Sequence, residues 1–133
     1  MITRNLRVNQ LSAPAFEWYL NYLGAMDRLD IEAYLRFLAD DCDLQFNNGP
    51  AIKGKPAIRN MLNGYWKSFA SIEHDLLNIY GVDDSFALEA DNHYKRHDGR
   101  SVTVSAVACT DRNRDGRATS VRIYADASPL FVN

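Results

Sequence analysis

The second half of the chain constrains the fold most, because strand-like segments alternate there with short turns. The segments SIEHDLLNIY, FALEADNHYKR, SVTVSAVACT and ATSVRIYAD are rich in β-branched, aromatic and other apolar residues. They are separated by GVDDS, HDGR and a segment that contains NRDG, and each of these holds residues that favour turns. Three short connections between four consecutive strands predict an antiparallel meander over residues 71–126.

The first half predicts three helices, each of which begins at a capping signal. Ser12 can cap a first helix with Pro14 in its first turn, Asp30 can cap a second, and Pro56 can open a third. The expected helices cover residues 12–28, 31–39 and 57–70. Helices followed by a meander predict an α+β fold. We therefore expect one domain over residues 1–133, with three N-terminal helices packed on one face of a curved, mostly antiparallel sheet.

Composition and charge argue against several classes of function. The formal net charge is −2 and the basic residues are scattered, so no nucleic-acid partner is expected. No run of about 18 apolar residues is present, so no membrane partner is expected. The two cysteines, Cys42 and Cys109, form no Cys-x-x-Cys motif and have no histidine at ligand spacing. We expect buried, reduced thiols in a cytoplasmic protein, without a metal site and without a cofactor.

An aspartate stands in the apolar face of the first predicted helix. Phe16, Leu20, Leu23 and Asp27 follow one another at spacings of four, three and four residues, so their side chains form one ridge. Two interpretations are open at this point. Either the helix frays and Asp27 is solvated beside Arg28, or Asp27 is buried and needs a hydrogen-bonded or charged partner.

A histidine on the first strand of the meander is a candidate partner for this acid. In SIEHDLL the alternation places Ile72, His74 and Leu76 on one face of the strand. A histidine between two aliphatic residues is either a core residue with satisfied hydrogen bonds or a functional group. Paired with Asp27, His74 would be a general base, because the carboxylate would fix the tautomer of the ring and stabilise the imidazolium.

The order of these segments resembles the SnoaL-like branch of the nuclear-transport-factor-2-like superfamily. The similarity extends from about residue 16 to residue 131 and rests on MDRLDIEAYLRFLADD, GKPAI, SIEH, the HDG hairpin and VRIYADASPLF. The resemblance implies a cone-shaped half-barrel whose helices close one side of a deep apolar pocket. This scaffold hosts isomerases, dehydratases, cyclases, epoxide hydrolases and proteins without catalytic activity, so the fold alone does not determine the function.

The resemblance also implies a set of site residues. Dehydratases of the superfamily carry a tyrosine and, five residues on, an aspartate in the first helix, and a histidine on the strand after the third helix. Tyr22, Asp27 and His74 match this pattern and are the expected catalytic residues. Bile-acid dehydratases add an arginine on the last strand, which Arg122 matches. They also add an aspartate on the strand after the histidine, which Asp91 matches only with a gap of one residue.

Strand alternation supplies further substrate-binding candidates. The strand over residues 86–96 carries Ala87, Glu89, Asp91 and His93 on one face, and Leu88, Ala90, Asn92 and Tyr94 on the other. Apolarity favours the second set, so Asn92 and Tyr94 are expected to line the pocket. We also assign Trp66 and Phe46 to the substrate-binding set. Phe46 stands approximately where ketosteroid isomerases of the superfamily carry their acidic base, so that mechanism is not expected.

Together these residues predict a cofactor-independent lyase or isomerase for a small apolar substrate, such as a polycyclic or aromatic compound. His74, oriented by Asp27, would abstract a proton next to a carbonyl, and Tyr22 with Arg122 would stabilise the enolate or assist the loss of a hydroxyl. Two alternatives stay open: polyketide-cyclase-like aldol chemistry, and a non-catalytic ligand-binding or accessory protein. The apolar segment DASPLFVN suggests a homodimer in which it packs across the partner.

Overall fold

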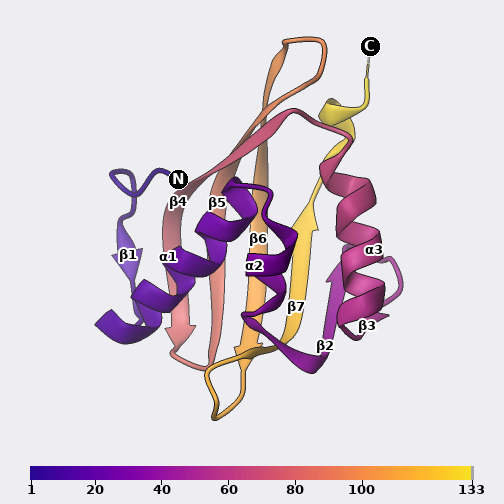
Figure 1. Cartoon of the computed structure of the whole chain (residues 1–133). Coiled ribbons are helices and arrows are strands. Elements are labelled where there is room, and N and C mark those ends of the chain that lie inside the picture. The colour runs from indigo at the N-terminus through magenta and orange to yellow at the C-terminus, as the bar shows by residue number, and fades with distance from the viewer. Residues whose placement is uncertain (133) are drawn as a thin grey trace.

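In the computed structural model, which describes residues 1–132, three helices lie on one face of a curved sheet (Figure 1). The helices are α1 (Ala13–Asp27), α2 (Ile31–Leu35) and α3 (Lys55–Trp66). The strands are β1 (Val8–Asn9), β2 (Leu38–Phe46), β3 (Ile52–Lys53), β4 (Ser71–Val82), β5 (Ser85–Lys95), β6 (Ser101–Arg112) and β7 (Ala118–Ala125). A short 3₁₀ helix, η1 (Ser128–Leu130), follows the last strand. The expected α+β architecture is confirmed.

Within residues 1–132, seven strands form one sheet in the order β1-β4-β5-β6-β7-β2-β3. Each strand from β4 to β7 is antiparallel to the next, which confirms the predicted meander. β2 runs parallel to β7 and β1 runs parallel to β4, so the sheet is mixed toward its edges. α1 contacts β4 near one edge and α3 contacts β2 near the other, so the helices span the inner face of the sheet (Figure 1).

The second and third helices are shorter than the periodicity predicted. α2 ends at Leu35 rather than at residue 39, because Leu38 already begins β2 and pairs with β7. α3 ends at Trp66 rather than at residue 70, because the chain turns there toward β4 and the Ala70 N–H donates a hydrogen bond to the Lys95 carbonyl. In both places strand pairing overrides a local helical pattern. Over the described residues, no helix has the length and apolarity needed to cross a bilayer.

The buried face of α1 includes only part of the predicted ridge and extends beyond it. Phe16 and Leu20 are half-buried, whereas Tyr19, Tyr22 and Leu23 are almost fully buried. The helix contacts β4 and α2, so its buried stripe is wider than one ridge and includes the tyrosines. Tyr22 therefore lies in the centre of the packed helix face.

Both cysteines are free thiols, as expected. Cys42 is buried on β2, and Cys109 is half-buried on β6. Burial raises the pKa of Cys42 to about 12, so its thiol stays protonated at neutral pH. Because the thiolate is the reactive form, Cys42 is a core side chain and not a nucleophile.

Candidate active site

A cavity lies between the helices and the inner face of the sheet. Its volume is about 70 Å³ and most of its wall is apolar. Its sheet wall includes alternate residues of β5, β6 and β7, namely Leu88, Ala90, Asn92, Tyr94, Val104, Ala106, Ala108, Thr110, Val121, Ile123 and Ala125, and further residues of β2 and β4. The inward face of β5 is therefore the one that carries Asn92 and Tyr94, as apolarity indicated. Trp66 and Phe46 line the same cavity.

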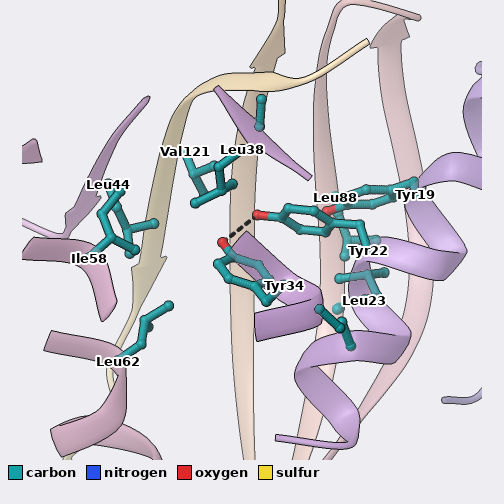
Figure 2. Close-up of a cluster of buried hydrophobic side chains, with 14 of the residues drawn as sticks. Tyr19, Tyr22, Leu23, Tyr34, Leu38, Leu44, Ile58, Leu62, Leu88 and Val121 are labelled. Carbon is teal, nitrogen blue, oxygen red and sulfur yellow. Dashed lines mark hydrogen bonds between the residues drawn. The ribbon is translucent and has the colours of Figure 1, made fainter. Parts of the chain in front are cut away.

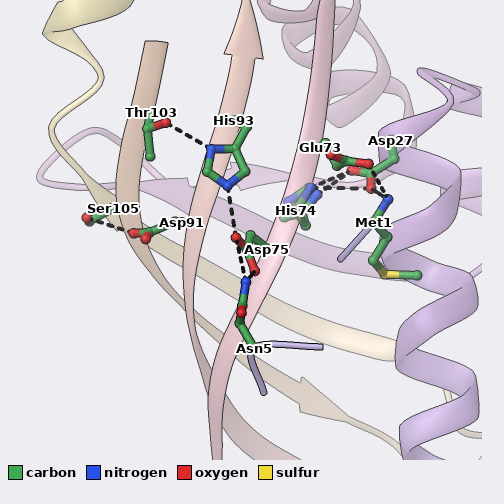
Figure 3. Close-up of polar contacts among 10 residues, drawn as sticks. All are labelled: Met1, Asn5, Asp27, Glu73, His74, Asp75, Asp91, His93, Thr103 and Ser105. Carbon is green, nitrogen blue, oxygen red and sulfur yellow. Dashed lines mark hydrogen bonds and ion pairs between the residues drawn. The ribbon is translucent and has the colours of Figure 1, made fainter. Parts of the chain in front are cut away.

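An acid–histidine pair joins α1 to β4 at the wall of this cavity (Figure 3). Asp27 is the last residue of α1, and its Oδ1 lies 2.5 Å from His74 Nδ1. The backbone N–H of His74 donates to the same oxygen at 3.2 Å. The two side chains are only 8% and 11% exposed, for His74 and Asp27 respectively. The structure therefore agrees with the second interpretation of Asp27, a largely buried carboxylate with a partner, and not with a frayed helix end.

This pairing decides which ring nitrogen of His74 is available. A carboxylate only accepts hydrogen bonds, so Nδ1 carries the proton that is donated to Asp27. Nε2 of the neutral ring then keeps its lone pair, and the side chain lines the cavity. The Met1 amino group lies 3.2 Å from Asp27 and 3.1 Å from Glu73, so a positive charge compensates the two acids. The arrangement suits a neutral base that is held in one orientation.

Two hydrogen-bonded pairs of tyrosines also line the cavity. Tyr22 and Tyr34 are hydrogen-bonded at 2.7 Å between their oxygens (Figure 2), and Tyr65 and Tyr94 at 3.2 Å. All four line the cavity. Burial raises the pKa of each of these phenols, so they remain neutral donors over the physiological range. Each pair holds two hydroxyl hydrogens and uses one internally, which leaves one for a ligand oxygen.

Removing one member of the inner pair tests this interaction. Tyr22→Phe is expected to lower the free energy of unfolding by about 1–3 kcal/mol, because the Tyr34 hydroxyl stays buried without its partner. The double variant with Tyr34→Phe should cost less than the sum of the two single changes. Urea unfolding of the four proteins measures both effects. Strictly additive values would contradict a hydrogen bond between the two phenols in solution.

Asn92 lies beside the histidine and has an unused polar atom. It faces His74 directly in the β4–β5 register, and its side chain lines the cavity. Asn92 is 8% exposed, and its Oδ1 has no hydrogen-bond partner among residues 1–132. An unpaired buried amide oxygen is costly, so a ligand O–H or N–H would find a ready acceptor there.

Two expected site residues lie on the other face of the sheet. Arg122 donates hydrogen bonds to Asp111 at 3.0 Å and to Ser120 at 2.8 Å. The residues of β7 that line the cavity are Val121, Ile123 and Ala125, which alternate with Arg122. Asp91 accepts a hydrogen bond from Ser105 and, by the same alternation, points away from the cavity. The expectation that Arg122 and Asp91 line the pocket was therefore wrong, because an inward position would bury an arginine or an acid in an apolar wall.

Sequence reasoning missed Tyr34 and Tyr65 as pocket residues. Both stand at helical spacing among apolar residues of the second and third helices, and periodicity does not distinguish a core tyrosine from one that lines a cavity. Within residues 1–132, no group of three or more His, Cys, Asp or Glu side chains is placed to hold a metal ion. The polar side chains that line the cavity include an imidazole, an amide, a threonine hydroxyl and phenols.

The comparison with known families agrees with this architecture. The sequence matches the family model described as a SnoaL-like domain over residues 19–121. The chain belongs to the SnoaL-like domain family. No curated protein matches the sequence.

Several solved structures share the fold of this SnoaL-like protein. An NTF2-like protein of unknown function from Burkholderia pseudomallei is 15% identical, with a TM-score of 0.78 and coverage of 90% of this chain and 95% of that one. A protein from Xanthomonas campestris pv. campestris, named as a candidate polyketide cyclase, is 25% identical, with a TM-score of 0.71 and coverage of 86% and 92%. A Mycobacterium tuberculosis protein in complex with estradiol-17beta-hemisuccinate is 19% identical, with a TM-score of 0.74 and coverage of 88% and 97%.

Proposed function

We propose that this SnoaL-like protein is a cofactor-independent lyase or isomerase, in which His74 abstracts a proton next to a carbonyl of a small apolar substrate. The observation that carries the proposal is the 2.5 Å contact between His74 Nδ1 and Asp27 at the wall of an apolar cavity. The contact leaves Nε2 as the basic atom, and Asp27 stabilises the imidazolium that forms. Such general-base assistance contributes about 10²- to 10⁴-fold in rate.

The enolate oxygen that forms in this step needs a hydrogen-bond donor. The Tyr22–Tyr34 pair keeps one free O–H, and the Tyr65–Tyr94 pair keeps another. A neutral phenol in an apolar wall stabilises developing negative charge well, because little water competes with it. If the substrate carries a hydroxyl on the next carbon, the same kind of donor assists its departure, and the overall reaction is a dehydration.

The dimensions of the cavity favour a compact substrate. Its volume of about 70 Å³ is well below the roughly 300–1,000 Å³ typical of pockets for drug-sized ligands. One or two small rings therefore suit the interior better than a larger polycyclic framework, and any larger part of the substrate would lie at the mouth. The apolar wall selects for rings without charged groups.

Deuterium exchange into a simple ketone tests the proposal without knowledge of the natural substrate. 2-Indanone places acidic CH₂ groups beside a carbonyl and next to one aromatic ring. The protein is expected to accelerate exchange of these hydrogens in D₂O, with saturation at high ketone concentration, and proton NMR follows the loss of signal. Binding of the ketone without accelerated exchange would favour the non-catalytic alternative instead.

Aldol cyclisation is the second candidate reaction, because it begins with the same enolate. The similarity to the candidate polyketide cyclase from X. campestris supports it.

We also propose a homodimer that is joined through the C-terminal segment, because Phe131 and Val132 are each 57% exposed. Sedimentation equilibrium measures the mass in solution, and the mass of a single chain would contradict the homodimer.

A further inference from the structure

A second acid–histidine pair lies on the face of the sheet away from the helices (Figure 3). His93 Nε2 is 2.9 Å from Asp75 Oδ2, and His93 Nδ1 is 2.8 Å from Thr103 Oγ1. Asn5 donates a hydrogen bond to Asp75 Oδ1 at 3.0 Å and so fixes the carboxylate from the other side. His93 and Thr103 are paired in register across β5 and β6. A hydroxyl, an imidazole and a carboxylate are therefore linked by two consecutive hydrogen bonds.

The protonation of this group follows from its contacts. The Asp75 side chain is 10% exposed, and the hydrogen bonds from His93 and then from Asn5 lower the pKa of Asp75. The ionised carboxylate only accepts, so His93 Nε2 carries the proton and Nδ1 of the neutral ring accepts one from Thr103. A hydroxyl bonded to a base that a third group orients is the arrangement that activates a nucleophile.

A shallow groove with a volume of about 220 Å³ opens beside this hydroxyl. Thr103 and Lys95 line it. Ser71 on β4 and Ser101 on β6 also line it, and both pair in register with Lys95 on β5. The ammonium and the two hydroxyls are donors that can stabilise a developing oxyanion next to Thr103. Glu73 also lines the groove, and its charge is compensated by the Met1 amino group at 3.1 Å.

We propose that Thr103 is a nucleophile, that His93 is its general base, and that the groove accepts the acyl group of small carboxylic esters. The Thr103 Oγ1–carbon bond forms while the bond from the carbonyl carbon to the leaving alcohol breaks. The proton passes from Thr103 through His93 Nδ1 to the departing alkoxide. Water then hydrolyses the acyl-threonine and restores the hydroxyl, so no other co-reactant is required. This activity is separate from the chemistry at His74, because the two histidines face opposite sides of the sheet.

p-Nitrophenyl acetate tests this activity on the full chain. We expect release of nitrophenolate and, by mass spectrometry, one acetyl group on the peptide that contains Thr103. Thr103→Val should abolish that adduct, Thr103→Ser should retain it, and His93→Gln should slow acylation about 10²-fold or more. Asp75 acts through His93 as a positioning residue, so Asp75→Asn should lower kcat and leave KM unchanged. If Asp75 only stabilised the fold, Asp75→Asn would change the free energy of unfolding but would not lower kcat at an unchanged KM.

Ser105 provides a matched control on the same strand and face. Its hydroxyl donates to Asp91 at 3.0 Å and not to a histidine, so Ser105→Ala should leave the rate unchanged. His97→Gln removes an exposed histidine outside the groove and should also have no effect. A wild-type rate in Thr103→Val, or acetyl groups spread over lysines and Ser105 without preference for Thr103, would overturn the proposal.

Discussion

Replacing His74 by glutamine is expected to slow deuterium exchange into 2-indanone by about 10²- to 10⁴-fold, the range of a lost general base. Glutamine can still donate a hydrogen bond to Asp27, so the buried carboxylate keeps a partner and the fold is retained. The ketone should bind to the variant nearly as well as before, because the wall of the cavity is otherwise unchanged. Exchange rates by proton NMR and binding by calorimetry separate the two effects.

Two further variants make the His74 result specific. Asp27→Asn keeps the shape of the side chain but removes the charge that stabilises the imidazolium, so it should also slow exchange. His97→Gln changes an exposed histidine on the β5–β6 connection and should leave the rate unchanged. If His74→Gln exchanged the ketone at the wild-type rate, His74 would not be the base, whatever the ligand affinity.

Gly81→Ala is expected to cause a large loss of stability, because the chain is tightly packed at the turn between β4 and β5. Gly81 has a φ of 132°, and an added Cβ would clash with the Ser85 carbonyl oxygen and lie 2.8 Å from Phe86 Cα. The backbone strain costs about 1–3 kcal/mol, and the overpacking against backbone atoms costs about 1–3 kcal/mol more. Urea unfolding should therefore show a loss of several kcal/mol.

Gly64 is the matched control for this substitution. It lies inside α3, and an added Cβ meets no atom within 4 Å. Gly64→Ala should stabilise the protein by about 0.5–1 kcal/mol, because alanine suits a helix interior better than glycine does. Equal effects at the two positions would contradict the tight β4–β5 turn. A stable Gly81→Ala protein would do the same.

Much of the fold could be predicted from local patterns. The turn-forming residues between the four strand-like segments predicted the meander, and the capping residues Ser12 and Asp30 marked two helix starts that the structure has. The helix ends at residues 39 and 70 were wrong, because pairing of the following strand is a long-range interaction. The same limit applies to α1, where packing against both β4 and α2 brought Tyr19 and Tyr22 into the core.

The candidate site shows a similar division. Asp27 and His74 were linked by an apolar ridge, a strand alternation and a family resemblance, and their side chains lie within hydrogen-bond distance. Arg122 was placed in the pocket by the motif match alone. The alternation in β7 already separated Arg122 from Val121 and Ile123, and burial of the apolar set puts the arginine outside.

The sequence by itself determined the order of the elements and the residues that share one face of each strand, because both depend on spacing along the chain. Only the tertiary structure decided which side chains meet across strands and helices. The Tyr22–Tyr34 contact joins two helices, and the row of Asp75, His93 and Thr103 joins three strands. Such contacts depend on register and on packing at long range, which no local period contains.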